Sequence, residues 1–222
     1  MRTLGVIGGM GPEATARFYE LFTTLDDAAC DQDRPDAIII SRPSIPDRTR
    51  HLLGLSGDDP APHIVQAAQQ LAAMGADCAA IPCLTSHCYL PRILPELKLP
   101  LIDMVKATTE AVAQRRVGLL ATDGTVQTGL FAALDPILPG ADGQRQLMKI
   151  IYEQLKTRKS PFSVDALLSI ADELFESGAE VVLLGCTELS LAARDPKIGG
   201  DTRFVDPLKL LARRALAFCK EE

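Results

Sequence analysis

An internal repeat limits the folds open to this chain more than any other feature. Cys83 ends an apolar run at residues 79–82 and is followed by polar residues. Cys186, 103 positions later, ends the apolar run at residues 181–185 in the same way. The same offset relates further pairs of similar residues: Gly75-Ala76 with Gly178-Ala179, Asp77 with Glu180, Asp103 with Asp206, and Lys106 with Lys209. Several matches in one register indicate duplication of one structural unit.

The repeat predicts two similar lobes. Gly5 and Gly118 correspond with an offset of 113, so the second unit is shorter between its first strand and its cysteine. We expect a first lobe at residues 1–100, a second at residues 101–206, and a C-terminal helix at residues 207–222 that packs back on the first lobe. A pseudo-two-fold relation would place Cys83 and Cys186 on opposite walls of one cleft.

Apolar runs alternate with amphipathic stretches along the whole chain. This alternation is typical of an α/β fold with mainly parallel sheets flanked by helices. Strands are predicted at residues 3–7, 37–40, 79–82, 100–102, 117–121, 181–184 and 204–205. Helices are predicted at residues 12–26, 62–74, 103–114, 126–134, 144–156, 164–177 and 207–219, with a long loop at residues 41–60. Ligands of such folds bind outside the carboxyl ends of strands, where both cysteines stand.

Composition excludes several classes of protein. Hydrophobic residues make up 47% of 222 residues and charged ones 23%, as in globular proteins, and no apolar run reaches the roughly 18 residues of a membrane span. The net charge of −6, without a basic cluster, argues against nucleic acid or an anionic membrane as a partner. The start of the chain lacks the pattern of a signal peptide, so we expect a cytoplasmic protein with free thiols.

Four motifs occur in order along nearly the whole chain: Gly8-Gly9-Met10-Gly11-Pro12-Glu13-Ala14-Thr15, Pro46-Asp47-Arg48-Thr49, the Cys83 turn, and Gly185-Cys186-Thr187-Glu188. Together they resemble the aspartate/glutamate racemase family. The resemblance implies racemisation of an acidic amino acid without cofactor or metal. It also implies a homodimer, and two cysteines that act on opposite faces of the substrate α-carbon.

The chemistry of racemisation explains the need for two such residues. A proton leaves one face of the α-carbon and another arrives on the opposite face, so a base and an acid must face each other and exchange roles. Cys83 and Cys186 fit these roles because turns that open helices stabilise thiolates. The hydroxyls of Thr85 and Thr187, with nearby backbone amides, are suited to bind the α-carboxylate.

Cations are expected at the substrate's side-chain carboxylate. Arg48 offers a planar fork for a carboxylate, and the resemblance implies a second cation, which we place at Lys156 although Lys159 competes for the role. Glu188 either contacts the substrate ammonium or caps the following helix.

The resemblance also places Met10 and Thr122 beside the substrate. Leu84 stands where the resemblance implies asparagine, so the side-chain amide is absent while the backbone N–H remains. His87 either orients a thiol or is structural.

Other interpretations stay open. Cys30, Cys78, Cys88 and Cys219 are expected to be inert, and Cys83 with Cys186 could be so too. Zinc or a redox pair would need a C-x-x-C spacing that the chain lacks. Residues 9–14 match a dinucleotide fingerprint, but no acidic residue ends the second strand. A decarboxylase, another isomerase or a ligand-binding protein without turnover are the functional alternatives.

Overall fold

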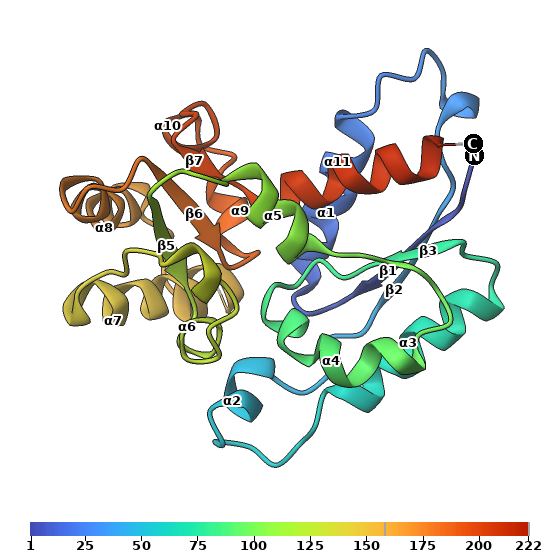
Figure 1. The fold of residues 1–222 in the computed structure, drawn as a ribbon, viewed down its shortest axis with the longest axis horizontal. Coiled ribbons are helices and arrows are strands. Elements are labelled where there is room, and N and C mark those ends of the chain that lie inside the picture. Colours follow the sequence, from blue (N-terminus) through green and yellow to red (C-terminus); the bar gives the residue numbers. More distant parts are fainter. Residues whose placement is uncertain (158, 222) are drawn as a thin grey trace.

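The chain forms two α/β lobes in the computed structural model, which describes residues 1–157 and 159–221 (Figure 1). The sheet of the first lobe has the order β2-β1-β3-β4 and that of the second has the order β5-β6-β7. All paired strands run parallel. The strands are β1 (Leu4–Gly8), β2 (Ala37–Ser41), β3 (Cys78–Ala80), β4 (Leu101–Ile102), β5 (Val117–Ala121), β6 (Val181–Gly185) and β7 (Phe204–Val205). The predicted α/β class with two lobes is confirmed.

Helices flank both sheets (Figure 1). The α-helices are α1 (Pro12–Thr24), α2 (Arg48–Leu52), α3 (Ala61–Ala73), α4 (Leu90–Ile93), α5 (Met104–Ala111), α6 (Asp123–Gln127), α7 (Ala141–Lys149), α8 (Val164–Glu176), α9 (Leu189–Ala192), α10 (Pro196–Gly199) and α11 (Pro207–Lys220). The short 3₁₀ turns are η1 (Asp31–Asp33), η2 (Thr85–Tyr89), η3 (Leu94–Glu96) and η4 (Ala132–Leu134), and η5 (Ile150–Lys156) is a π-helix that continues α7. None of the helices in the described ranges is both long enough and apolar enough to cross a bilayer.

Two predicted segments differ from the observed ones. Residues 41–60 were expected to be a loop, but they contain α2, because the Asp47 carboxylate accepts a hydrogen bond from the Arg50 N–H and caps this helix. The single helix expected at residues 126–134 is instead α6 followed by η4, with Gly129 between them at φ +65°. A residue in the left-handed region ends a helix, which the apolar spacing alone does not reveal.

The repeat is visible in equivalent contacts of the two lobes. The Asp77 carboxylate accepts a hydrogen bond from the Thr3 N–H at 2.7 Å, just before β1. The Glu180 carboxylate accepts one from the Arg116 N–H at 2.8 Å, just before β5. The paired acidic residues therefore fix the start of the first strand of each lobe.

The paired residues Asp103 and Asp206 also have equivalent roles, because each caps the N-terminus of a helix. Asp103 accepts a hydrogen bond from the Lys106 N–H at 3.0 Å and caps α5. Asp206 accepts one from the Leu208 N–H at 2.9 Å and caps α11. The helices α5 and α11 are thus equivalent elements, and they pack against each other.

The boundary between the lobes lies later than expected. Leu101 pairs with Ala79 of β3, so β4 belongs to the first sheet although residues 101–206 were assigned to the second lobe. A strand is placed by the partner that satisfies its hydrogen bonds, and this partner is remote in sequence. The chain therefore crosses between the lobes through α5, and returns through α11 to α1 and α5.

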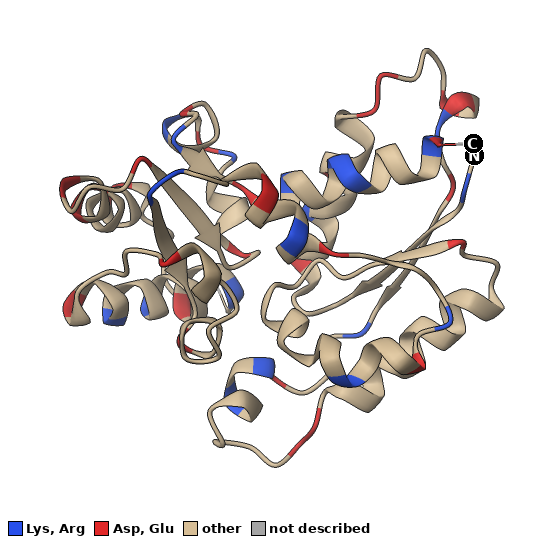
Figure 2. Cartoon of the chain, in the orientation of Figure 1, with Lys and Arg blue, Asp and Glu red and all other residues tan. Residues whose placement is uncertain are grey.

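One apolar cluster extends from one lobe to the other through α11. Leu208, Leu211 and Leu216 of α11 are buried in this cluster. Leu4 of β1 and Leu183 of β6 belong to the same cluster. Basic and acidic residues are interspersed over the surface of both lobes (Figure 2). The lobes therefore share a core on the α11 side, whereas charged side chains meet between them elsewhere.

Gly9 provides a test of the turn that follows β1. Its φ is +91°, and a Cβ added there would lie 2.2 Å from the backbone nitrogen of Arg42. We expect Gly9→Ala to lower the free energy of unfolding by about 2–4 kcal/mol, through backbone strain and overpacking. Gly57→Ala is the matched control, because its Cβ would meet nothing within 4 Å. Urea unfolding would measure both, and equal stabilities of the two variants would contradict the assignment.

Candidate active site

The two cysteines line one cavity between the lobes. Cys83 follows β3, whose pairing stops before Pro82 because proline has no N–H to donate. Cys186 follows β6 directly. The cavity is lined by Met10, Asp47, Arg48, Thr49, Cys83, Leu84, Thr85, Lys156, Cys186, Thr187 and Glu188. Of the predicted site residues, only Thr122 lies outside this lining, and its hydroxyl is 3.4 Å from that of Thr49.

His87 holds the backbone of the Cys83 turn. Its Nε2 accepts a hydrogen bond from the Met104 N–H at 3.3 Å, so Nδ1 carries the proton and donates to the Cys83 carbonyl at 2.9 Å. Burial lowers the pKa of His87, which keeps the ring neutral. Of the two roles considered for His87, the structure supports the structural one, because both ring nitrogens bind backbone groups. Both ring nitrogens are engaged, so the ring offers no lone pair to a zinc ion.

Cys186 lies against a carboxylate. Its Sγ donates a hydrogen bond to Glu188 Oε2 at 2.9 Å, and both side chains are buried. Burial raises the pKa of Cys186 well above its usual value, and the Glu188 carboxylate raises it further, while Lys156 acts in the opposite direction. The thiol form therefore dominates at this position near neutral pH.

Arg48 is buried and bound mainly to the main chain. Its Nη1 donates to the carbonyls of Ile45 and Pro46 at 3.2 and 2.9 Å, and its Nη2 donates to the Met10 carbonyl at 3.0 Å. Its Nε has no hydrogen-bond partner in the described part of the chain. Burial lowers the pKa of Arg48, but Cys83 and Asp47 raise it beyond the ordinary value. The guanidinium is thus a cation fixed by three of its five N–H groups, rather than the open fork expected from the sequence.

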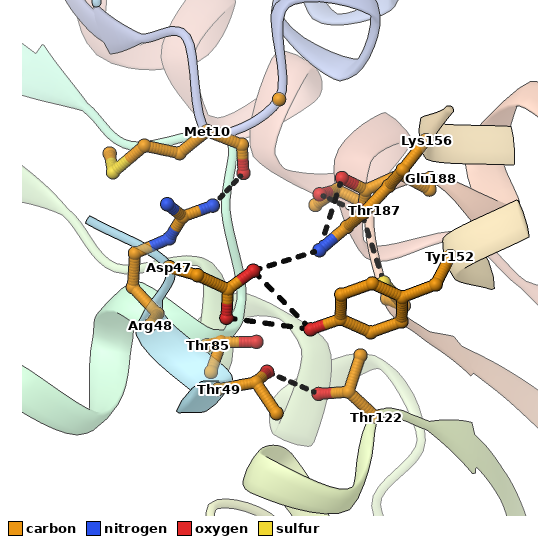
Figure 3. A network of polar contacts seen from close by, with 12 residues as sticks. Met10, Asp47, Arg48, Thr49, Thr85, Thr122, Tyr152, Lys156, Thr187 and Glu188 are labelled. Atoms are coloured by element: carbon orange, nitrogen blue, oxygen red, sulfur yellow. Dashed lines mark hydrogen bonds and ion pairs between the residues drawn. The ribbon is translucent and has the colours of Figure 1, made fainter. Parts of the chain in front are cut away.

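A polar network joins the lobes around Lys156 (Figure 3). Lys156 Nζ lies 3.9 Å from Glu188 Oε1 and 4.0 Å from Asp47 Oδ2. It also lies 4.3 Å from the centre of the Tyr152 ring. The Tyr152 hydroxyl donates to the Asp47 carboxylate, 3.4 Å from each oxygen. Burial lowers the pKa of Lys156, but Glu188 and other anionic neighbours raise it above its ordinary value.

The sequence did not lead us to place Tyr152 or Asp47 in the site. Asp47 caps α2 and also faces the second lobe. Tyr152 stands four residues before Lys156 in η5, a spacing that places both on one face of a helix. This spacing was the feature of the sequence from which Tyr152 could have been predicted to lie beside Lys156. Lys159 lines a different cavity, with Phe162 and Arg194, so Lys156 is the lysine that faces the cysteines.

Threonine hydroxyls form a chain across the cleft below this network. Thr49 reaches Thr122 at 3.4 Å, and Thr122 and Thr85 each reach Thr125 at 3.2 Å. Leu84 beside them is 1% exposed and belongs to the apolar cluster shared by the lobes. Leucine at this position therefore packs as a core residue while it lines the cavity.

Comparison with known proteins identifies the family. Residues 7–215 match the sequence profile of the Asp/Glu/Hydantoin racemase family. The chain belongs to this family. The expected kinship with aspartate/glutamate racemases is confirmed, and with it the class of enzyme.

Individual relatives agree with this assignment. A glutamate racemase of Deinococcus radiodurans is 30% identical over 139 residues, which are 58% of this chain and 47% of that protein. The aspartate racemase of Picrophilus torridus has a similar structure, with a TM-score of 0.85 and 24% identity over 100% of this chain and 96% of that one. Glutamate racemase of Francisella tularensis in complex with D-glutamate has a TM-score of 0.70 and 16% identity over 98% of this chain and 80% of that one. The likeness to these structures establishes the fold.

The cavity between the cysteines of this racemase-family protein is almost closed. Its volume is about 10 Å³, which is at the lower limit of what a single water molecule needs. A neighbouring cavity of about 370 Å³ is also lined by Asp47, Arg48, Lys156 and Glu188. The charged network lines both spaces and forms the wall between them.

Arg48 is expected to support the fold as well as the site. Arg48→Leu would leave three main-chain carbonyls without their donors, and we expect it to lower the free energy of unfolding by about 2–4 kcal/mol. Arg50→Leu on the same helix is the control, because the Arg50 side chain is exposed and, within the described part of the chain, donates only to the Leu55 carbonyl, at 3.3 Å. Urea unfolding of both variants measures the difference. A fully stable Arg48→Leu protein would show that the carbonyls find water instead.

Proposed function

We propose that this chain is a cofactor-independent racemase of an acidic amino acid, aspartate or glutamate, that moves the α-proton between Cys83 and Cys186. The observation that carries the proposal is the placement of both thiols, one from each lobe, on a single cavity that also contains Arg48 and Lys156. Two cations beside the thiols fit a substrate with two carboxylates. The names of the relatives support the same substrate class.

The reaction needs one thiolate and one thiol. The thiolate takes the α-proton from one face of the substrate and becomes a thiol, leaving a carbanion conjugated with the carboxylate. The opposite thiol then gives its proton to the other face and becomes a thiolate. Positive charge from Arg48 and Lys156 stabilises the anionic intermediate, and the protonation of the two cysteines is reversed after each turnover.

Single-cysteine variants test the proton transfer. We expect Cys83→Ser and Cys186→Ser each to reduce racemisation by roughly 10²–10⁴-fold, because a serine hydroxyl is a far weaker acid than a thiol. Polarimetry and α-proton exchange in deuterated water, starting from each enantiomer of aspartate and glutamate, are the measurements.

Cys30→Ser is the control for these variants, because Cys30 is exposed and remote from the cavity lining. Near-native turnover in either Cys83→Ser or Cys186→Ser would refute the two-cysteine mechanism. A native protein that shows a thermal shift with these amino acids, but neither exchange nor another reaction, would be a binding protein.

Substitution of the two competing lysines tests the substrate class. Lys156→Met removes a charge-assisted contact of about 1.5–3 kcal/mol, so kcat/KM for aspartate or glutamate should fall roughly 10- to 100-fold or more. Activity on alanine, if any is measurable, should change little, because alanine has no second carboxylate. Lys159→Met, on a different cavity, should leave all rates near native. Equal losses from both substitutions would argue against a specific role of Lys156.

The homodimer and the cytoplasmic location stay predictions that rest on the family resemblance and on the character of the sequence. Sedimentation equilibrium at the concentration used for assays measures the assembly directly, and a clean monomer would contradict the expected dimer.

A further inference from the structure

We propose that Glu188 is a positioning residue that holds Cys186 as a protonated thiol in the free protein, so that Cys186 is ready to give a proton to the substrate. The inference deepens the proposed racemase and rests on it. The contact that carries it joins Cys186 Sγ and Glu188 Oε2 at 2.9 Å, with Glu188 only 4% exposed. A thiolate at Cys186 would lose this hydrogen bond and stand beside a buried negative charge.

The repeat shows that this arrangement is peculiar to one lobe. With the offset of 103 that relates the cysteines, Glu188 corresponds to Thr85. The Thr85 hydroxyl lies 3.2 Å from that of Thr125, in the chain of threonines across the cleft. A neutral hydroxyl therefore follows the first cysteine at the place where a carboxylate follows the second.

The charge on Glu188 is only partly balanced. Its Oε1 is buried and has no hydrogen-bond partner among the described residues, and the nearest cation is Lys156 Nζ at 3.9 Å. Gly11 faces the same oxygen from the first lobe, and a Cβ there would lie 3.3 Å from it. Much of the negative charge therefore remains available to act on the sulfur of Cys186.

Other charged groups around this pair act from both lobes. Lys156 and Tyr152 face it from η5, and Arg48 and Asp47 line the same region from the first lobe. Lys156 opposes the effect of Glu188 on the pKa of Cys186, while burial acts in the same sense as Glu188. Arg48, by contrast, is influenced by Cys83 on the opposite wall. The cleft thus has a cationic wall at Cys83 and an anionic contact at Cys186.

This polarity has a consequence for catalysis. An enantiomer whose α-hydrogen faces Cys83 meets a protein whose opposite thiol already carries the proton to be delivered. The other enantiomer requires that the proton first move from Cys186 to Cys83. The equilibrium constant of racemisation is one, so kcat/KM must be equal in the two directions and cannot show the asymmetry. The asymmetry must therefore be measured as protonation of the thiols.

Site-resolved alkylation of the full-length protein tests the inference without substrate. Iodoacetamide labelling of Cys186 would be followed by mass spectrometry as a function of pH, in native protein and in Glu188→Gln. Removing the negative charge should shift the labelling midpoint of Cys186 downward by about one pH unit or more, equivalent to a tenfold gain in rate near pH 7.5. An unchanged midpoint in Glu188→Gln would overturn the proposal.

Two further variants separate charge from shape. Glu188→Asp keeps the carboxylate and should retain a midpoint closer to native than Glu188→Gln does. Lys156→Met removes the opposing cation and should shift the Cys186 midpoint upward. A downward shift in both Lys156→Met and Glu188→Gln would indicate that the cavity has merely opened, and this would overturn the proposal. If Glu188→Gln did not fold, the upward shift expected of Lys156→Met and the near-native midpoint expected of Glu188→Asp would still decide.

Glu153→Gln, an exposed substitution on η5, is the control and should behave as native protein. Labelling of Cys83 in the same samples reports whether the cavity has become more accessible. The outcome is independent of turnover: a shifted midpoint in a protein that does not exchange α-protons would support the role of Glu188 and refute the racemase. Exchange with an unshifted midpoint would do the reverse.

Discussion

The cleft of this protein depends on charged side chains that are largely removed from water and meet there from both lobes. Glu188 and Lys156 belong to the second lobe, and Asp47 and Arg48 to the first. A buried charge without a partner costs several kcal/mol, and Lys156 offsets part of this cost by pairing with Glu188 of its own lobe and with Asp47 of the first lobe. The arrangement of the lobes and the electrostatics of the site therefore depend on each other.

Duplication of the structural unit and later divergence of its two copies account for different features of the cleft. The acidic clamps before β1 and β5, and the aspartate caps of α5 and α11, repeat in both lobes and place the two strand ends toward one cavity. Proton transfer across an α-carbon needs that symmetry of position, but it also needs an acid and a base that differ at any one moment. The residues that break the repeat, Thr85 against Glu188, stand beside the cysteines and supply this difference.

The sequence predicts most of what local patterns control. The strand positions and the two cysteines follow from apolar periodicity and the repeat, whereas Arg48 and Lys156 are placed in the site through the family resemblance. The membership of β4 in the first sheet does not follow, because Leu101 finds its partner Ala79 through tertiary pairing. Tyr152 escaped notice for a related reason. Its importance comes from Asp47, which lies 105 residues away in the chain and closes the network from the other lobe.

The distribution of contacts between the lobes determines where the closed cavity can open. On the α11 side the lobes share an apolar cluster that includes Leu208 and Leu211, and separating them there would expose hydrocarbon at about 25 cal/mol per Å². On the other side the lobes meet through Lys156 and Asp47 at 4.0 Å, through the Tyr152 hydroxyl at 3.4 Å, and through threonine hydroxyls at 3.2 and 3.4 Å. These contacts are longer than good hydrogen bonds, and water can replace them at little cost. Opening is therefore cheapest at the charged wall, and a ligand that enters there meets Lys156 and Arg48 before it reaches the thiols. For the proposed acidic substrate, a carboxylate would gain from that encounter, whereas a neutral side chain would only separate the existing pairs, so the same charged residues would both close the cavity and favour acidic ligands.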